Sequence, residues 1–351
     1  MNIQWPLSAI DSLHPPKIPL ALLPTPLQPL DRLSAQLPGP RIWIKRDDLT
    51  GSTLSGNKVR KLEYVIAEAI AQGCNMLITC GGLQSNHCRA TAFAGAQLGL
   101  PVHLLLRGAA PSSSDGNLLL DRLAGAEISY YPGEDYGAII NGLFEQWVYH
   151  YQQQGLTPYC IPMGASDGVG TWGYLSACAE LRQDFDRLGI KPSYIICATG
   201  SAGTQAGLTL GSYQYGLNAQ VIGMAVCDNE AYFQEKVAAD IRDWQARYLP
   251  DEKQPLTDAL SIQTNDRYIG PGYAKADTEV FDTIAWLARE EGVLLDPVYT
   301  AKAFHGLITE LRQGHYSDAD DIVFVHTGGQ FGLFPHGMSA QMAARSQFGT
   351  T

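Results

Sequence analysis

The lysine at position 58 is the first residue whose setting in the sequence indicates chemistry. It opens the stretch KVRKLEYVIAEAI, in which apolar residues fall on one stripe and predict a helix over 58–72. Arg60 and Lys61 follow closely, and cations in the first turn of a helix oppose its dipole, so they form a solvated basic face or lie near an anion. The helix start and the neighbouring cations should lower the pKa of Lys58. A lysine held partly neutral can attack a carbonyl carbon and form a Schiff base.

The glycines before this helix have almost the spacing of a phosphate-binding P-loop. Four residues separate Gly51 from Gly56, but Asn57 follows the second glycine, where a P-loop has lysine. Val59 also offers no hydroxyl to a metal ion. A nucleotide hydrolase of the P-loop class is therefore disfavoured.

A second polar turn follows the predicted strand at 76–80. Two glycines lead from this strand into Gln84, Ser85, Asn86 and His87, which open the next predicted helix. Free backbone N–H groups at a helix start, together with these side chains, predict a binding site for a carboxylate. Capping by Ser85 or Asn86 explains part of the pattern, but four polar residues in a row exceed what a cap needs. A module that binds an amino acid without catalysis would need this turn but not the lysine.

A third turn consists mainly of small residues. It has the sequence ATGSAGTQAGL at 198–208, between a predicted strand and a helix, and its N–H groups can hold a phosphate. It lacks the GxGxxG pattern, and Gly223 stands where a dinucleotide site has an acidic residue, so a phosphate monoester fits better. Two further segments are less specific. HTGGQFG at 326–332 reads by itself as a tight turn, and Tyr273 lies in a Gly/Pro loop, where packing is the commoner role.

These turns connect elements that alternate along the chain. The predicted strands are 41–45, 76–80, 101–106, 127–131, 159–163, 193–198, 219–226 and 321–326. The predicted helices are 58–72, 87–98, 116–124, 137–153, 170–188, 203–214, 229–247, 277–291 and 300–313. Residues 1–40 hold nine of the 20 prolines and predict an extended arm. Apolar strands separated by helices indicate an α/β fold with parallel sheets, in which ligands bind at the carboxyl ends of the strands.

The composition limits the classes of partner. The chain of 351 residues is 45% hydrophobic with a net charge of -11, which argues against nucleic acid or an anionic membrane as partner. The seven cysteines are scattered without a CxxC pair, which indicates reduced thiols in a cytoplasmic protein. The first 30 residues show no signal-peptide pattern, and no apolar run is long enough to span a bilayer. We expect no metal site.

A phosphate turn, an activated lysine and a carboxylate turn are together what a pyridoxal-phosphate (PLP) enzyme acting on an amino acid requires. The segments KRDDLTG, SGNKVRKLEY, GGLQSNH, GSAGTQAGL, GPGY, LLDPVYTAKA and HTGG resemble, in order, the D-cysteine desulfhydrase and 1-aminocyclopropane-1-carboxylate deaminase family, and the resemblance covers nearly the whole chain. It implies an α/β fold of type II, like that of tryptophan synthase β, in which each of two domains is an open, mostly parallel sheet flanked by helices. It also implies PLP as cofactor, a small amino acid as substrate, and a homodimer.

The resemblance further implies a division of the chain. Residues 1–56 and 164–351 would form a large PLP-binding domain, and residues 57–163 a small domain. The cofactor and the active site would lie in the cleft between them.

By the same resemblance, Lys58 holds the cofactor covalently, and Ser85 and Tyr273 are the other catalytic residues. The residues implied in cofactor binding are Asn57, Lys58, Lys61, Asn86, Gly200, Ser201, Ala202, Gly203, Thr204, Tyr273 and Thr327. The residues implied in binding the substrate carboxylate are Ser85, Asn86 and His87. The small residues of the third turn resemble the phosphate cradle, Lys61 resembles the lysine that reaches the phosphate, and Thr327 the partner of the pyridine nitrogen. Lys58, Ser85 and Tyr273 each stay candidates for the base that removes the Cα proton.

Two positions distinguish the branches of the family. The deaminases usually have glutamate directly before the GPGY tyrosine and leucine in the HTGG turn, where this chain has Gly272 and Thr327. Both differences favour D-cysteine, which β-elimination converts to pyruvate, sulfide and ammonia. Ser55 and Ala202 stand where glycine is expected, so other substrates stay open: 1-aminocyclopropane-1-carboxylate, L-cysteate, D-serine and β-chloro-D-alanine.

Overall fold

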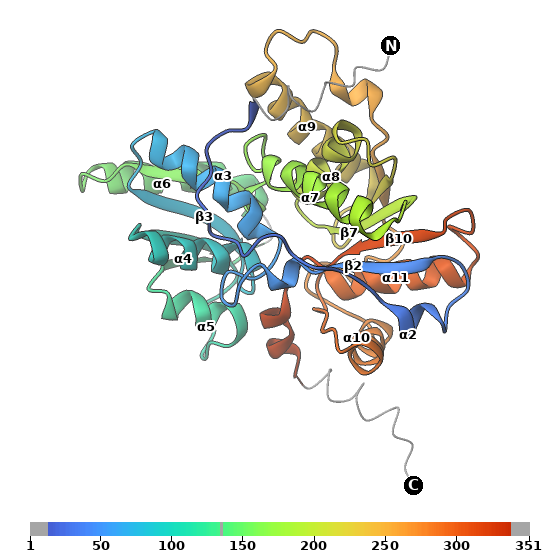
Figure 1. The fold of residues 1–351 in the computed structure, drawn as a ribbon. Helices are drawn as coiled ribbons and strands as arrows, with labels where there is room; N and C mark the ends of the chain where they lie inside the picture. Colours follow the sequence, from blue (N-terminus) through green and yellow to red (C-terminus); the bar gives the residue numbers. More distant parts are fainter. Residues whose placement is uncertain (1–12, 134–135, 338–351) are drawn as a thin grey trace.

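Over residues 13–133 and 136–337, the part of the chain that the computed structural model describes, the strands form two separate sheets (Figure 1). The strands are β1 (Leu27–Pro29), β2 (Arg41–Lys45), β3 (Met76–Gly82), β4 (Val102–Arg107), β5 (Glu127–Tyr131), β6 (Pro158–Ile161), β7 (Tyr194–Thr199), β8 (Gln220–Ala225), β9 (Gln263–Asn265) and β10 (Asp321–Val325). One sheet has the order β1-β2-β10-β7-β8-β9, with β1 antiparallel to β2 and all other pairs parallel. The other has the order β5-β4-β3-β6 and is parallel throughout.

Helices occupy the segments between these strands. The α-helices are α2 (Asp31–Ser34), α3 (Lys58–Ala71), α4 (Asn86–Leu98), α5 (Gly116–Leu123), α6 (Tyr136–Gln152), α7 (Trp172–Leu188), α8 (Gly203–Gln214), α9 (Glu230–Tyr248), α10 (Thr278–Glu291) and α11 (Thr300–Arg312). Short 3₁₀ turns are η1 (Asp47–Leu49), η2 (Met163–Ala165), η3 (Leu256–Ala259) and η4 (Gln330–His336). All predicted strands and helices are present, with ends that agree within two residues. The α/β class and the mostly parallel sheets are confirmed.

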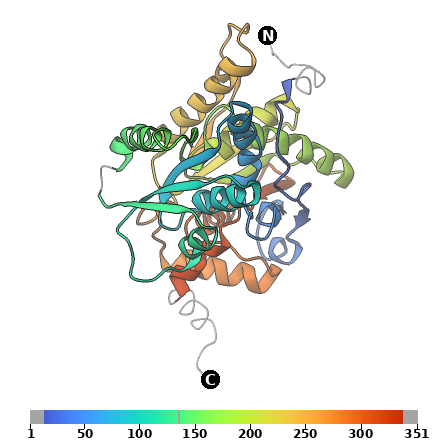
Figure 2. The same ribbon diagram turned by 90° about the vertical axis from the view of Figure 1, so that its left-hand side faces the viewer.

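Helices cover both faces of the six-stranded sheet. Alternate residues of β10 point to opposite faces: Val323 and Val325 pack in the core that includes α7 and α8, whereas Ile322 and Phe324 pack in the core that includes α10 and α11. Figure 1 shows these two helical layers on either side of β2, β7 and β10. Figure 2 views the molecule from the side of the four-stranded sheet, whose two faces pack against α4 and α6.

Strands β3 and β7 hold equivalent places in their sheets. From β3 the chain continues to β4 and β5 on one side and later returns to β6 on the other side. From β7 it continues to β8 and β9 and later returns to β10 on the other side. In open α/β sheets a ligand binds where the strand order reverses in this way. The turn after β3 contains the polar residues 84–87, and the turn after β7 is the turn of small residues within 198–208.

The remaining bulk expectations concern thiols, membranes and metals. All seven cysteines are free thiols, as expected, and burial raises the pKa of Cys197 to about 12. None of the helices in the described ranges is both long and apolar enough to cross a membrane. Within the same ranges, no group of His, Cys, Asp and Glu side chains could hold a metal ion.

Candidate active site

A cavity of about 410 Å³ lies where residues from the carboxyl ends of both sheets meet. The predicted site residues that line it are Asn57, Lys58, Ser85, Asn86, His87, Gly200, Ser201, Ala202, Thr204, Tyr273 and Thr327. Two other predicted residues, Lys61 and Gly203, are not part of its wall. Gly203 belongs to the turn of small residues at 199–204, called the glycine turn below, and Lys61 lies directly beside it. Residues far apart in the sequence are thus brought to one place.

Lys58 begins α3, and its side chain lines the cavity. Burial lowers the pKa of Lys58 from 10.5 to about 8, and the charge of Asp296 opposes this shift. The direction predicted from the sequence is confirmed, but the cause is burial rather than the neighbouring cations. Asp296 is itself buried, and its carboxylate accepts hydrogen bonds from the backbone N–H groups of residues 298–300. At neutral pH part of the Lys58 population is neutral and able to act as a nucleophile.

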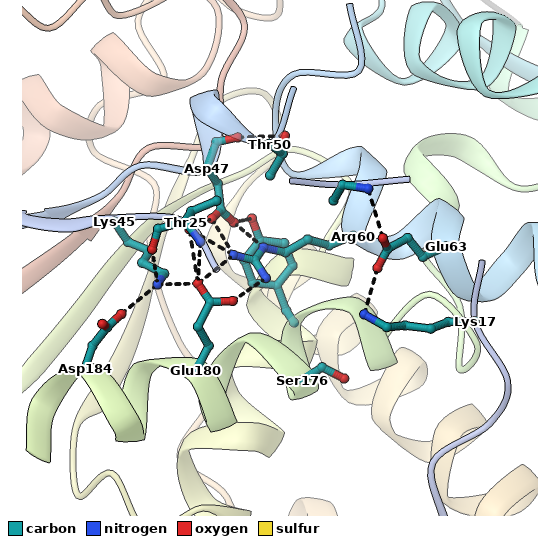
Figure 3. A network of polar contacts seen from close by, with 12 residues as sticks. Lys17, Thr25, Lys45, Asp47, Thr50, Arg60, Glu63, Ser176, Glu180 and Asp184 are labelled. Carbon is teal, nitrogen blue, oxygen red and sulfur yellow. Dashed lines mark hydrogen bonds and ion pairs between the residues drawn. The ribbon is translucent and has the colours of Figure 1, made fainter. Parts of the chain in front are cut away.

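Arg60 does not belong to the cavity, because it binds a buried group of carboxylates (Figure 3). Its Nε and Nη2 donate to the two carboxylate oxygens of Asp47, each at 2.8 Å, and its Nη1 donates to Glu180 at 3.0 Å. Burial would lower the pKa of Arg60, but these two carboxylates raise it well above its ordinary value. The solvated basic face is therefore wrong for Arg60 and also for Lys61, which are 2% and 0% exposed.

Lys61 lies one helical turn after Lys58 and is buried beside the glycine turn. Its Nζ donates to Ser166 Oγ at 3.2 Å, and a Cβ at Gly203 would lie 3.0 Å from it. Burial and the charge of Lys58 lower the pKa of Lys61 well below its ordinary value. Among the described residues, no carboxylate lies within ion-pair distance of this amine. A phosphate bound at the turn would favour its charged form and so reverse the shift.

The glycine turn after β7 is held in shape by Ser166. The hydroxyl of Ser166 donates to Ser201 Oγ at 3.0 Å, and the backbone N–H of Gly203 donates to Ser166 Oγ at 3.2 Å. A Cβ at Gly203 would lie 2.7 Å from Ser166 Oγ, so only glycine fits. Ala202 adopts a φ of +72°, a left-handed conformation that is strained for a residue with a Cβ, at a position where the sequence resemblance leads us to expect glycine.

Asn57 connects the start of α3 to two other turns. Its Nδ2 donates to Thr204 Oγ1 at 2.8 Å, and its backbone N–H donates to the carbonyl of Thr327 at 3.1 Å. A Cβ at Gly56 would lie 2.8 Å from that same carbonyl, and the φ of Gly56 is +99°. The close approach therefore requires glycine directly before Asn57.

Ser85 is the N-cap of α4, which confirms the capping interpretation for this residue. Its Oγ accepts a hydrogen bond from the backbone N–H of Cys88 at 3.2 Å. A Cβ at Gly81 would lie 2.6 Å from Ser85 Oγ, so glycine allows Ser85 to fold back against the end of β3. The capping role does not remove Ser85 from the cavity wall.

Asn117 on α5 orients Asn86. Its Nδ2 group donates to Asn86 Oδ1 at 2.9 Å and to the carbonyl of Gln84 at 3.0 Å, while its Oδ1 accepts from Arg89 Nε at 2.9 Å. These partners fix which side of each amide is oxygen. The Nδ2 group of Asn86 has no acceptor among the described residues, so it can donate to a carboxylate or carbonyl in the cavity.

His87 is neutral and presents an acceptor. Its Nε2 lies 2.7 Å from the hydroxyl of Thr79, which itself donates to the carbonyl of Ile161 at 2.9 Å. The hydroxyl therefore accepts from Nε2–H, and His87 Nδ1 is left without a hydrogen on it. Burial and the charges of Lys58 and Lys61 hold the pKa of His87 well below its ordinary value. Nδ1 has no partner in the described part of the chain.

Tyr273 forms a pair with Tyr299, which the sequence interpretation did not assign. Their hydroxyl oxygens are 2.7 Å apart, and burial raises the pKa of both phenols. The Tyr273 ring covers the end of β3, since a Cβ at Gly82 would lie 3.5 Å from it. The guanidinium of Arg107 lies 5.4 Å from the centre of this ring and also lines the cavity.

The signals for the residues that were missed differ. Tyr299 stands inside the segment LLDPVYTAKA, so its position between a Pro and a helix start could have indicated a site. Ser166 and Asn117 follow no chemical pattern, and only the fold shows their contacts. Ser166 lies in the connection between η2 and α7, and Asn117 lies on α5, and no turn motif marks either place.

The residues fit PLP on structural grounds. A partly neutral amine faces the cavity, and a second buried amine without a carboxylate lies beside a turn rich in N–H and hydroxyl groups. Two buried polar atoms of wall residues, His87 Nδ1 and Thr199 Oγ1, lack partners in the described ranges. Buried polar groups in proteins are normally paired, so these atoms indicate a polar ligand.

Comparisons with known proteins also indicate a PLP-dependent enzyme. A family model described as "Pyridoxal-phosphate dependent enzyme" matches residues 18–328. The bifunctional D-cysteine desulfhydrase/1-aminocyclopropane-1-carboxylate deaminase of Arabidopsis thaliana is 40% identical over 335 residues, which are 90% of this chain and 78% of that protein. The D-cysteine desulfhydrase of Klebsiella pneumoniae is 38% identical over 334 residues, which are 92% of this chain and 96% of that protein.

Solved structures agree with these relatives. The crystal structure of an ACC deaminase homologue is 34% identical, has a TM-score of 0.86, and covers 95% of this chain and 99% of its own. A fungal L-serine ammonia-lyase from Rhizomucor miehei, at 18% identity and a TM-score of 0.65 over 93% of this chain and 98% of its own, shares the fold. The chain therefore belongs to the pyridoxal-phosphate-dependent enzymes, in the family of D-cysteine desulfhydrases and 1-aminocyclopropane-1-carboxylate deaminases.

Proposed function

We propose that this PLP-dependent lyase acts on D-cysteine and releases pyruvate, sulfide and ammonia. The observation that carries the proposal is that three groups share one cavity. These are the Lys58 amine with a pKa of about 8, the polar turn at 84–87 and the glycine turn at 199–204. The relatives named D-cysteine desulfhydrase support this substrate.

In this proposal Lys58 holds the cofactor covalently. The phosphate would be held by Lys61 and by the glycine turn, whose members are Gly200, Ser201, Ala202, Gly203 and Thr204. Asn57, Asn86 and Thr327 line the cavity, where the two asparagines would orient the cofactor ring and Thr327 would be the partner of its nitrogen. When bound, the cofactor withdraws electrons from the Cα atom of the amino acid, which the side chains of the protein cannot do by themselves.

The protein groups bind the substrate and move its protons. The carboxylate is bound by Ser85, the Asn86 amide and the N–H groups at the start of α4, since a helix start favours an anion. His87 contributes its backbone N–H at the helix start, whereas its neutral ring presents an acceptor at Nδ1 and cannot donate to the carboxylate. The Cα proton goes to Lys58 on one face of the substrate, or to Ser85 or Tyr273 on the other. Tyr299 holds the Tyr273 hydroxyl at 2.7 Å and so fixes its direction.

The second candidate reaction is deamination of 1-aminocyclopropane-1-carboxylate. The bifunctional relative from Arabidopsis thaliana and the homologous crystal structure support it. Gly272 and Thr327, which replace the glutamate and leucine usual in deaminases, favour D-cysteine. A hydroxyl partner leaves the ring nitrogen largely unprotonated, whereas a carboxylate would favour its protonation. L-cysteate, D-serine and β-chloro-D-alanine are further substrates of the same class.

The test is release of a 2-oxo acid and ammonia from a panel of these amino acids, with L-cysteine included. The wild-type protein should be yellow with bound PLP, should be trapped by borohydride, and should turn over D-cysteine fastest. Lys58→Ala should bind PLP without the borohydride-stable link and should lose turnover. The exposed Lys191→Ala variant is the matched control and should behave as wild type. A colourless wild-type protein that binds no PLP would contradict the whole proposal, and a faster reaction with another amino acid would change the substrate.

We also propose the domain division and a homodimer. The strands of the four-stranded sheet all fall within residues 57–163, and those of the six-stranded sheet fall within 1–56 and 164–351, which supports the two-domain division. A homodimer is implied by the family and is tested by light scattering of the purified protein. A mass of one chain, 38.1 kDa, would contradict it.

A further inference from the structure

Lys302 is a buried lysine outside the cavity wall, and it has no role in the proposed chemistry. It lies on α11 and is 1% exposed. Its Nζ donates to the carbonyls of Ile269 and Gly272, each at 2.7 Å, and to that of Val226 at 3.4 Å. Within the described residues no carboxylate lies at ion-pair distance from it. The ammonium is therefore satisfied by three backbone carbonyls.

These carbonyls belong to two segments that border the cavity. Val226 follows β8, directly before two residues of the cavity wall. The other two carbonyls lie in the loop 266–277, which contains neither helix nor strand and carries Tyr273. Gly270 and Gly272 in this loop have φ angles of +67° and +124°. Because glycine restricts the backbone less than any other residue, this loop depends on contacts with its surroundings to keep one shape.

The contact with Gly272 bears directly on Tyr273. The carbonyl that Lys302 binds belongs to the peptide unit from which Tyr273 projects. At the other end of the side chain, the Tyr273 hydroxyl meets that of Tyr299 at 2.7 Å. Tyr299 stands at the start of α11, so the first turn of this helix contacts the Tyr273 hydroxyl and also the carbonyl of the residue before Tyr273.

We propose that Lys302 is a positioning residue, which holds the Tyr273 hydroxyl in the cavity by fixing the backbone of Gly272. The inference deepens the proposed function and rests on it where it assigns Tyr273 a part in the reaction. A lysine suits this place because an ammonium donates three hydrogen bonds from one atom. A side chain without donors would leave buried carbonyls unpaired.

The first test compares steady-state kinetics. Lys302→Met keeps the length of the side chain and removes its donors. We expect kcat to fall roughly 10- to 100-fold, because a small displacement of a reacting group has an effect of that size. KM should stay within about twofold, since Ser85 and Asn86 do not contact Lys302. The exposed Lys191→Met variant is the matched control, and an unchanged kcat for Lys302→Met overturns the proposal.

The second test asks whether Lys302 acts through Tyr273. If it does, adding Lys302→Met to Tyr273→Phe leaves kcat at the value of Tyr273→Phe alone. A purely structural role would instead multiply the two losses, and that result overturns the proposal.

The third test needs no turnover, so it separates this inference from the proposed function. In the cofactor-free protein, amides of residues 267–276 should exchange hydrogen about tenfold faster in Lys302→Met than in wild type, with α3 unchanged. If this holds while the wild type turns over none of the amino acids, the proposed function fails and the anchoring role stands. If the wild type is active and neither exchange nor kcat changes, only the inference fails.

Gly272→Ala gives an independent variant in case Lys302→Met does not fold. A Cβ at Gly272 meets nothing within 4 Å, but its φ of +124° disfavours alanine. The substitution should therefore shift the carbonyl that Lys302 binds without a side-chain clash. It should reproduce the loss of kcat, and wild-type kcat in this variant would count against the proposal.

Discussion

Replacing Lys58 by methionine should make the cofactor-free protein more stable at neutral pH. Folding buries the Lys58 amine and lowers its pKa from 10.5 to about 8. At about 1.4 kcal/mol per pKa unit, the charged amine opposes folding by about 3 kcal/mol at neutral pH. Because Lys58 is only half-buried beside the cavity, solvent screening should reduce the gain to about 2 kcal/mol. The charge of Lys58 also lowers the pKa values of Lys61 and His87, so its removal would raise both pKa values.

The gain should depend on pH in a window that the two pKa values define. The unfolded chain keeps the Lys58 proton up to about pH 10.5, whereas the folded chain releases it near pH 8. Wild-type stability should therefore rise relative to the variant as the pH increases between these values. The difference should be largest below pH 8 and should vanish above pH 10.5. A gain from apolar packing of methionine would instead be the same at every pH.

The assay is urea unfolding of the PLP-free proteins at about pH 7 and about pH 10.5. Lys191→Met, at an exposed site, should change the free energy of unfolding by less than about 0.5 kcal/mol at either pH. The reasoning is refuted if Lys58→Met is no more stable than wild type near neutrality. It is also refuted if the gap between them persists at the higher pH.

Three further substitutions test other parts of the site. Asp47→Asn should lower the free energy of unfolding by about 3 kcal/mol in urea titrations, because it leaves the buried Arg60 with incomplete pairing; a change under 1 kcal/mol would contradict this. Gly203→Ala should weaken PLP binding at least about tenfold in an absorbance titration, because its Cβ would collide with the serine and lysine beside the phosphate turn; unchanged affinity would show that the turn is not the phosphate site. Asn117→Asp, which cannot donate to Asn86 Oδ1, should raise the substrate KM about tenfold with little change in the PLP spectrum, and wild-type KM would exclude this orienting role.

Most of the strands that the sequence predicts are apolar runs buried on both faces, whereas β5 and β6, at the edges of the four-stranded sheet, are only partly buried. In β10, the run DIVFV is buried at every position and is therefore continuous in apolar character. The two strands that were missed, β1 and β9, are three residues long and lie at the edges of the six-stranded sheet. The residues of β9 are Gln263, Thr264 and Asn265, which carry no apolar signal, and Pro29 in β1 is tolerated because an edge strand can lack one donor. Their pairing depends on neighbours that only the fold supplies.

The residues of the site, like the strands, divide into those that the sequence could predict and those that it could not. Ser85, Asn86 and the glycine turn could be predicted because they directly follow apolar strands, and the carboxyl ends of strands are where ligands bind. Ser166, Tyr299 and Asn117 could not be predicted in this manner. Each acts through a partner more than 20 residues away, so its contribution exists only after the chain has folded.

The cations of α3 show what helical periodicity can predict and what it cannot. Lys58 and Lys61 are three residues apart and share one face, whereas Arg60 lies roughly 200° around the helix from Lys58. The apparent cluster is therefore two features: one pair near the cavity and one arginine on the opposite side.

Periodicity cannot show that Arg60 meets Glu180, which is 120 residues further along the chain. That pairing decides which of the three cations can bind a ligand. A buried cation with full ion pairing has nothing left for a ligand. Lys58 is half-buried and Lys61 is fully buried, and both have depressed pKa values and too few partners of their own. An aldehyde bound to Lys58 and a phosphate beside Lys61 would each supply the partner that these amines lack. Arg60 fixes α3 to the proposed large domain, and the same helix presents its two incompletely paired amines to one ligand.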